Sequence, residues 1–194
     1  LKLLRATIPA TIDIRRHIAC EGDTILADPT EFHQILMNLC TNAVHAIGEA
    51  SGVLSVALAP VRLDRAAALR YDNLDPGRHV RLTVADTGRG IEPEVMDRIF
   101  DPYFTTKEIG QGLGMGLAIV HGIVKKNEGA IRVESRVGQG TTVEGLFPRI
   151  ETPLEAECPE PAVLPRGSER ILVVDDEASL VDMTTQMLEK LGYT

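Results

Sequence analysis

The stretch "EIGQGLGMGLAIV", residues 108–120, carries the strongest fold signal in the chain, because four glycines at alternate positions run directly into an apolar segment. The pattern is neither the Gly-x-x-x-x-Gly-Lys-Ser/Thr of a P-loop nor the Gly-x-Gly-x-x-Gly of a dinucleotide-binding fold. A helix that begins at about Gly116 would offer unpaired N–H groups and the positive end of its dipole to a phosphate. The stretch therefore predicts a glycine hinge that leads into a phosphate-attracting helix over 116–126, with a merely flexible loop as the alternative.

The clearest helix start lies in "ADPTEFHQILMNLCTNAVHAIG", residues 27–48. Asp28 is a good N-cap, a proline occupies the first helical position, and Glu31 completes an Asp-x-x-Glu capping box. Apolar residues recur at helical spacing, and Gly48 ends the pattern. We expect one long amphipathic helix here.

Asn38 and Asn42 lie one turn apart on this helix and so share a face. At about 100° per residue, Asn42 falls at the edge of the apolar stripe. Its amide oxygen could point into a pocket and bind Mg²⁺, a cation that takes few protein ligands together with phosphate oxygens. The alternative is a pair of ordinary polar surface residues.

Strands are expected at "IDIRRHIA", "GVLSVALAPV" and "RHVRLTVAD", and the last two are separated by an insertion that ends in an Asp-Pro-Gly turn. "AIRVESR" and "TTVEGLF" predict a hairpin with a glycine-containing connection. Antiparallel signals mixed with helices predict an α+β fold, a two-layer sandwich with the helices on one face of the sheet.

Asp86 ends the strand pattern "VRLTVAD", where alternation places it on the same face as the apolar residues. A carboxylate in that position needs a partner. The following "TGRG", residues 87–90, predicts a tight turn that leaves room for a flat ligand, and an adenine amino group would be a suitable donor. The alternative is an aspartate that caps its own turn.

The segment "RIFDPYFTTKEIG", residues 98–110, holds three of the seven aromatic residues of the chain within five positions. A short helix is expected to precede it, from about Pro93 to Phe100. Two threonines and Lys107 offer hydroxyls and a positive charge beside the glycines. The alternative is a helix end with a packed aromatic cluster.

Composition limits the partners of these 194 residues. With 20 basic and 28 acidic residues the formal net charge is −8, which argues against binding to nucleic acid or to an anionic membrane. The three cysteines form no CxxC pair and are expected to be free thiols in a reducing, cytoplasmic compartment. Because residue 1 is leucine, we expect a longer parent protein, and a membrane anchor elsewhere in that parent would be compatible with this sequence.

Four motifs occur in a fixed order: "NLCTNAVHA", "DTGRGI", "FDPYFTTK" and "GLGMGLAIV". In this order they resemble the N, G1, F and G2 boxes of the ATP-binding catalytic domain of two-component sensor histidine kinases, part of the gyrase, chaperone, histidine-kinase and mismatch-repair ATPase superfamily. The resemblance covers residues 1–148 and implies a two-layer α/β sandwich of a mixed sheet and three helices.

The resemblance implies a role for each motif. Asn42 would bind the Mg²⁺ that bridges the ATP phosphates, and Asp86 would accept a hydrogen bond from the adenine amino group. The segment from about residue 103 to 114 would form a lid, with Lys107 on a phosphate. The residues implied around ATP are Asn38, Asn42, His45, Asp86, Gly88, Gly90, Ile91, Tyr103, Phe104, Thr105, Thr106, Lys107, Gly112, Leu113, Gly114, Met115, Gly116 and Leu117.

Two positions depart from the family pattern. Leu113 stands where the G2 box usually has a threonine, which removes a hydroxyl from the lid. His45 stands where many relatives have a lysine or arginine that reaches toward phosphate, so its charge could modulate binding near neutral pH, with a solvent-facing histidine as the alternative.

The C-terminal part changes character. Residues 149–169 are rich in proline and glutamate and predict a linker. After it, "ILVVDDE" resembles the opening of a response-regulator receiver domain, so residues 170–194 are expected to form a truncated βα unit with a buried-type strand. Asp175 and Asp176 would belong to an incomplete Mg²⁺ site. The resemblance implies a hybrid kinase as parent, expected to be a homodimer.

The family transfers phosphate to a histidine on a separate dimerising helical hairpin, and no histidine of this sequence fits that role. We therefore expect ATP–Mg²⁺ binding without autophosphorylation. One alternative is an ATP hydrolase of the same superfamily, which is disfavoured because Asn38 stands where those relatives place a glutamate base. The other is a degenerate nucleotide-binding module that acts through protein contacts.

Overall fold

The computed structural model describes residues 8–20, 23–69, 71, 74–106, 113–150, 167–174 and 178–193. The chain divides into two compact units, residues 1–153 and 154–194. The first unit contains β1 (Ile12–Ile18), β2 (Thr24–Ile25), α2 (Pro29–Ile47), β3 (Gly52–Leu63), α3 (Arg65–Ala68), β4 (Gly77–Asp86), the 3₁₀ helix η1 (Pro93–Arg98), α4 (Gly116–Lys126), β5 (Ala130–Arg136) and β6 (Gly140–Ile150). The second contains α5 (Ala178–Lys190).

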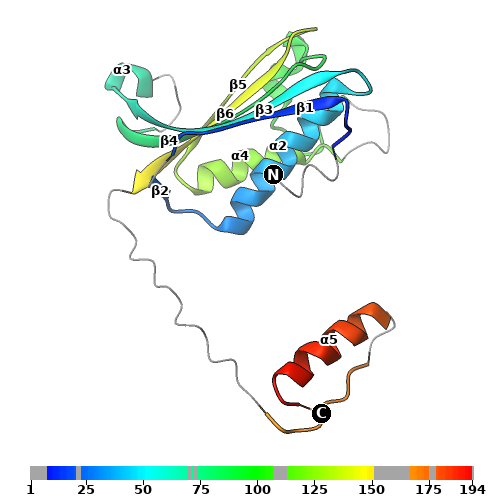
Figure 1. Cartoon of the computed structure of the whole chain (residues 1–194). Coiled ribbons are helices and arrows are strands. Elements are labelled where there is room, and N and C mark those ends of the chain that lie inside the picture. The colour runs from blue at the N-terminus through cyan, green and yellow to red at the C-terminus, as the bar shows by residue number, and fades with distance from the viewer. Residues whose placement is uncertain are drawn as a thin grey trace. The chain divides into compact units, whose positions relative to one another are not determined.

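A mixed sheet forms one layer of the first unit (Figure 1). Its strand order is β1-β3-β4-β6-β2, and β5 pairs with β6. β1 is parallel to β3, whereas the other pairs are antiparallel. The predicted α+β fold with strands at these segments is confirmed.

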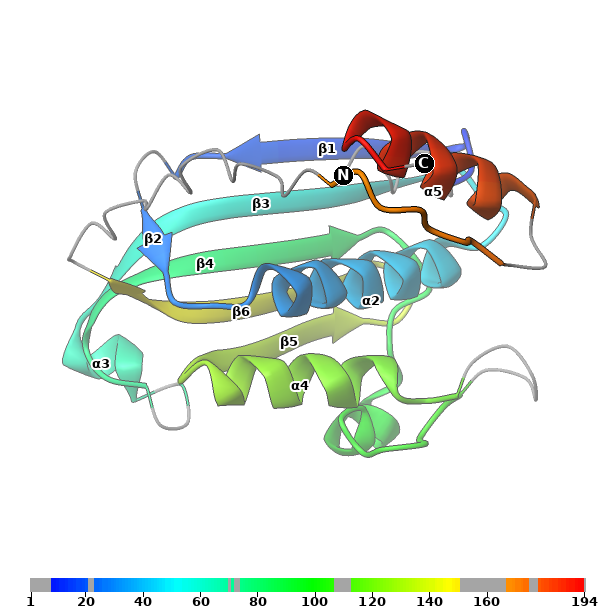
Figure 2. The ribbon, with the colours of Figure 1, turned by 90° about the horizontal axis from the view of Figure 1, so that it is seen from below.

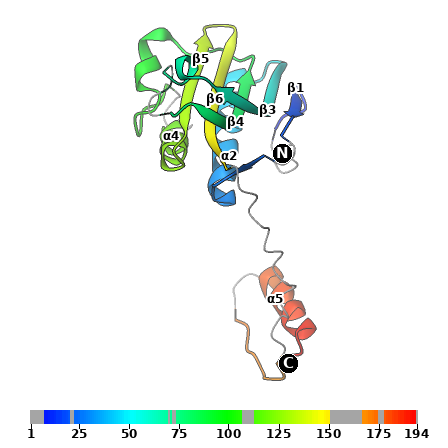
Figure 3. The same cartoon turned by 90° about the vertical axis from the view of Figure 1, so that its left-hand side faces the viewer.

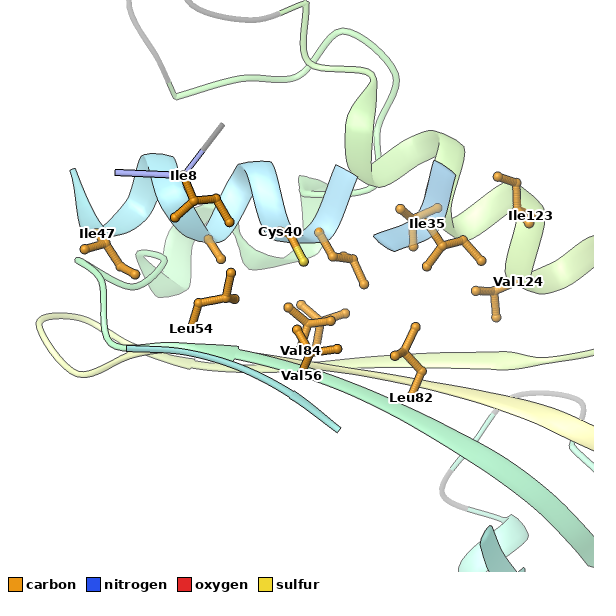
Figure 4. Packing of buried hydrophobic residues seen from close by; sticks show 14 of the residues in the cluster. Ile8, Ile35, Cys40, Ile47, Leu54, Val56, Leu82, Val84, Ile123 and Val124 are labelled. Carbon is orange, nitrogen blue, oxygen red and sulfur yellow. The ribbon is translucent and has the colours of Figure 1, made fainter. Parts of the chain in front are cut away.

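Helices α2 and α4 lie side by side across one face of this sheet (Figures 2 and 3). Their apolar stripes and the facing side chains of the strands form the main core, part of which is drawn in Figure 4. Ile35, Cys40 and Val120 from the helices are almost completely buried, as are Leu54 and Leu82 from the sheet. The core thus fixes the positions of the two helices relative to β4.

The N-terminus of α2 differs in one respect from the predicted capping box. Asp28 caps the helix by accepting a hydrogen bond from the backbone N–H of Thr30 at 2.7 Å, and Gly48 ends it with φ 68°. Glu31, in contrast, directs its carboxylate to α4, where Lys126 Nζ lies 2.6 Å away. The Lys126 ammonium group offers the Glu31 carboxylate a positive charge. The backbone N–H of Asp28, which would be the donor in a capping box, is uncharged and makes a weaker hydrogen bond.

The insertion between β3 and β4 corrects the expectation that all helices cover one face. α3 lies on the face opposite to α2 and α4 (Figure 1). Its Ala68 and the nearby Leu74 pack on Leu63, Ala130 and Leu146 of the sheet. Because Leu146 alternates with the core residue Phe147 along β6, it points outward and needs this second cover.

The second unit lacks one predicted element. Residues 171–174 of "ILVVDDE" form no strand, and the side chains of Leu172 and Val174 are largely exposed. A strand needs a neighbour for its backbone hydrogen bonds, and the described part of this unit supplies none. The predicted helix is present as α5. None of the helices in the described ranges combines the length and apolarity that crossing a bilayer requires.

Candidate functional site

A cavity of about 650 Å³ lies between α2, the start of α4, the end of β4 and the loops that follow β4 and η1. Most of the residues singled out from the sequence line it. They are Asn38, Asn42, His45, Asp86, Gly90, Ile91, Phe104, Thr105, Thr106, Leu113, Gly114, Met115, Gly116 and Leu117. Gly88 and Tyr103 lie next to the cavity without lining it, whereas Lys107, Gly112, Asp175 and Asp176 fall outside the described residues.

The two asparagines of α2 face the first residue of α4. A Cβ atom built on Gly116 would lie 3.5 Å from Asn42 Nδ2 and 3.6 Å from Asn38 Oδ1. Asn38 Nδ2 is buried and has no hydrogen-bond partner in the part of the chain that the structure describes. Buried amide donors are usually hydrogen-bonded, so this group is available to a polar atom of a ligand.

The N-terminus of α4 opens into the same cavity. Its N-cap residue, Met115, makes no side-chain capping bond, and Gly116 and Leu117 line the cavity. The first N–H groups of a helix have no partner within the helix, and the helix dipole makes this end attractive to anions. The predicted helix over 116–126 is confirmed, and its start is suited to phosphate oxygens.

Asp86 combines the two roles that its sequence position left open. Its Oδ1 accepts a hydrogen bond from the backbone N–H of Gly88 at 2.8 Å, so it caps its own turn, and it also lines the cavity. Burial raises the pKa of the Asp86 carboxyl above its usual value, while the backbone amides of Gly88 and Thr141 act in the opposite direction. The carboxylate is therefore held at the cavity wall at a cost in desolvation.

We expect Asp86→Asn to stabilise the fold at neutral pH. Because the folded-state pKa is raised above the unfolded value, the stability that the protonated group contributes at low pH is lost as the pH rises through the folded pKa. Asparagine undergoes no such ionisation. The Tm difference between variant and wild type should be smallest at the acid end and grow toward pH 7, and thermal unfolding across this range measures it. A Tm difference that does not change with pH would contradict the raised pKa of Asp86.

The turn after Asp86 is fixed from two sides. Arg89 N–H donates to the carbonyl of Ala46 on α2 at 2.9 Å, and the Arg89 carbonyl accepts from the N–H of Gly138 at 2.7 Å. A Cβ on Gly88 would lie 2.6 Å from the Ala46 carbonyl oxygen. Gly88 therefore shapes the site by allowing close contact with the helix.

The adjoining ends of β5 and β6 contribute residues that the motifs did not reveal. Gly140 has φ 106°, and a Cβ there would collide with the backbone carbonyl of Asp86. Thr141 is buried and lines the cavity, and the hydroxyls of Ser135 and Thr141 lie 2.8 Å apart. Ser135 Oγ also accepts from the N–H of Ile91 at 2.9 Å. In the sequence, Ser135 and Thr141 show only strand patterns and Gly140 only a connection, because the contacts of these residues join segments far apart along the chain.

The aromatic segment packs at the opposite wall. The Arg98 guanidinium lies 4.4 Å from the centre of the Phe104 ring, and the Phe100 ring lies 5.0 Å from the ring of His121 on α4. Gly114 has φ 67°, and a Cβ there would lie 2.6 Å from the carbonyl oxygen of Phe104. Tyr103 is largely exposed, so the three aromatic residues do not form the packed cluster expected as the alternative. Phe100 and Phe104 pack instead against His121 and Arg98, near the backbone that leads into α4.

Comparison with known proteins agrees with this geometry. Residues 27–151 match the family described as histidine kinase-, DNA gyrase B- and HSP90-like ATPases. The chain belongs to this family. It is an ATP-binding catalytic domain of the histidine-kinase type found in two-component sensor kinases.

The relatives support the same assignment. The sensor kinase CckA of Brucella abortus (strain 2308) is 36% identical over 179 residues, which are 88% of this chain and 19% of the relative. The sensor histidine kinase ZraS of Escherichia coli (strain K12) is 42% identical over 118 residues, which are 61% of this chain and 22% of the relative. This catalytic domain therefore spans about a fifth of the length of these curated relatives.

Two solved structures are similar. The catalytic domain of histidine kinase ThkA is 30% identical with a TM-score of 0.57, and the match covers 76% of this chain and 84% of that one. Full-length ShkA in complex with AMPPNP is 28% identical with a TM-score of 0.59, and the match covers 99% of this chain and 36% of that one.

Proposed function

We propose that this domain binds ATP together with Mg²⁺ in the cavity and donates the γ-phosphate to a histidine on a helical hairpin outside the chain. The observation that carries the proposal is the meeting of three groups at one cavity of about 650 Å³: the α2 asparagines, Asp86 and the uncapped start of α4. The structure of full-length ShkA in complex with AMPPNP adds support, since AMPPNP is an ATP analogue.

Each group has a part in binding. The Asp86 carboxylate would accept a hydrogen bond from the adenine amino group, and the N–H groups at the start of α4 would hold phosphate oxygens. The oxygen-bearing amide of Asn42, with Asn38 beside it, suits Mg²⁺, which takes few protein ligands and keeps phosphate oxygens. Mg²⁺ would neutralise charge on those oxygens, and the residues of this chain orient the nucleotide for in-line transfer.

The phosphate acceptor lies outside the described residues of this domain. His17 is on β1, His33 and His45 are on α2, His79 is on β4 and His121 is on α4. All of these elements belong to the catalytic domain itself. None of the five histidines is therefore the nucleophile that a separate hairpin would carry. The parent protein, which we propose to be a homodimeric hybrid kinase, would supply that hairpin.

The rest of the chain also enters this proposal. We assign residues 1–148 to the catalytic domain, 149–169 to a linker, and 170–194 to the start of a receiver domain with Asp175 and Asp176 at its Mg²⁺ site. The support is the "ILVVDDE" motif and the helix that follows it.

Asn42→Ala should remove the contribution of Mg²⁺ to ATP affinity. We expect calorimetry to show a loss of about 10- to 100-fold with Mg²⁺ present, in line with about 1.5–3 kcal/mol for an interaction with a charged group, and little change in EDTA. Gln34→Ala is the matched control, because Gln34 is exposed on α2 and does not line the cavity. A variant that keeps the full enhancement by Mg²⁺ would show that Asn42 is not the metal ligand.

A further inference from the structure

Three arginines lie on adjacent strands: Arg62 near the end of β3, Arg78 near the start of β4 and Arg149 near the end of β6. β2 pairs with this end of β6 (Figure 1). Arg62 of β3 is directly opposite Arg78 of β4. Arg149 of β6 follows Pro148, the residue paired with His79, and so takes the next position, opposite Arg78. The three side chains therefore form one row across β3, β4 and β6, which we call the arginine row.

A small cavity of about 170 Å³ lies at the arginine row. Its lining consists of Pro60, Val61, Arg62, Arg78, His79 and Arg149. The row lies far from the large cavity, because Arg78 and Asp86 are near opposite ends of β4, about 27 Å apart along an extended strand. A ligand at the arginine row would leave the nucleotide cavity accessible.

The charges of the row are only partly balanced. Arg149 Nε lies 2.9 Å from Asp23 Oδ1, whereas Arg62 and Arg78 have no ion pair within the described ranges. None of the described residues that line the cavity has an acidic side chain. Neighbouring strands are about 4.8 Å apart, and like charges directly opposite each other destabilise a sheet. The local charge at the arginine row is thus positive, although the net charge of the chain is −8.

We propose that the arginine row binds a small, doubly charged oxyanion of the phosphate class. The planar donor fork of arginine matches phosphate oxygens, and several guanidinium groups on one side suit an anion with several acceptors. Three hydrogen-bonded strands hold the backbone positions of the three arginines close together before a ligand binds. The cavity of about 170 Å³ is large enough for a phosphate group, and a bound anion would relieve the repulsion between Arg62 and Arg78.

NMR titration of the ¹⁵N-labelled chain with inorganic phosphate, at constant ionic strength and with AMPPNP–Mg²⁺ present, tests the proposal. We expect saturable shifts for Val61, Arg62 and Arg78. The double substitution Arg62→Gln/Arg78→Gln should weaken binding at least tenfold. The matched double substitution Arg15→Gln/Arg132→Gln, at exposed arginines that pair with Asp13 and Glu134, should not. Thermal unfolding of each variant checks that the fold is intact.

The source of the phosphate group is distinguished by a second probe, O-phosphoserine. Arginine-dependent binding of either probe supports the proposal: inorganic phosphate alone indicates a free ion, and O-phosphoserine indicates a phosphorylated side chain. Arg62→Lys/Arg78→Lys should retain only part of the affinity, because lysine keeps the charge without the fork. Shifts that are equal in the glutamine variant, or that sodium chloride reproduces, would overturn the proposal whatever the outcome at the nucleotide cavity.

Discussion

Asp86→Asn is expected to lower the affinity for ATP by about 10- to 100-fold, because it removes a charged acceptor worth about 1.5–3 kcal/mol. The Asp86 Oδ1 atom is already engaged by the N–H of Gly88 at 2.8 Å. If asparagine keeps that bond through its oxygen, its NH₂ group would face the adenine amino group, so that two donors meet. Calorimetric titration with ATP–Mg²⁺ measures the loss.

This substitution separates affinity from stability. The same variant should be more stable than wild type at neutral pH, because burial raises the pKa of Asp86. A loss of binding could then not be assigned to unfolding. Asp13→Asn is a suitable control, since Asp13 is exposed on β1 and pairs with Arg15. Unchanged ATP affinity in Asp86→Asn would show that the Asp86 carboxylate does not bind the adenine amino group.

Gly90→Ala is expected to cause the largest loss of stability among these substitutions, about 2–5 kcal/mol of the free energy of unfolding. Gly90 has φ 75°, which disfavours any residue with a Cβ, and that Cβ would also collide with the backbone carbonyl of Arg136. The collision involves backbone on both sides, so a side-chain rotation cannot relieve it. Urea denaturation measures the change.

Gly138→Ala provides the matched control. Gly138 has φ 73°, close to that of Gly90, yet nothing lies within 4 Å of the position that its Cβ would take. This variant should therefore show only the left-handed backbone penalty of about 1–2 kcal/mol. Equal losses in the two variants would mean that the contact between the turn at Gly90 and the end of β5 does not support the site.

The sequence was sufficient where local chemistry decides the outcome. The α2 and α4 helices follow from apolar periodicity, and Asp28 and Gly48 mark the ends of α2 in both sequence and structure. The order of the motifs predicted the family and the fold of the first unit. The position of Asp86 at the cavity followed from alternation along one strand.

Contacts between distant segments could not be predicted in this way. Glu31 was expected to cap its own helix, but Lys126 stands 95 positions away and offers a charge. The outward face of Leu146 is covered by an insertion for which we predicted only the Asp-Pro-Gly turn at its end. Gly140 and Thr141 approach Asp86 because β4 and β6 are neighbours in the sheet, which no spacing along the chain reveals.

Transfer of the γ-phosphate from ATP to a histidine can be measured directly. Labelled ATP–Mg²⁺ is incubated with the chain alone and with the separately produced helical hairpin of its parent kinase. We expect acid-labile phosphohistidine on the hairpin, none on the chain alone, and strongly reduced transfer with Asp86→Asn. Release of free phosphate without labelling of the hairpin would contradict the account and favour an ATP hydrolase.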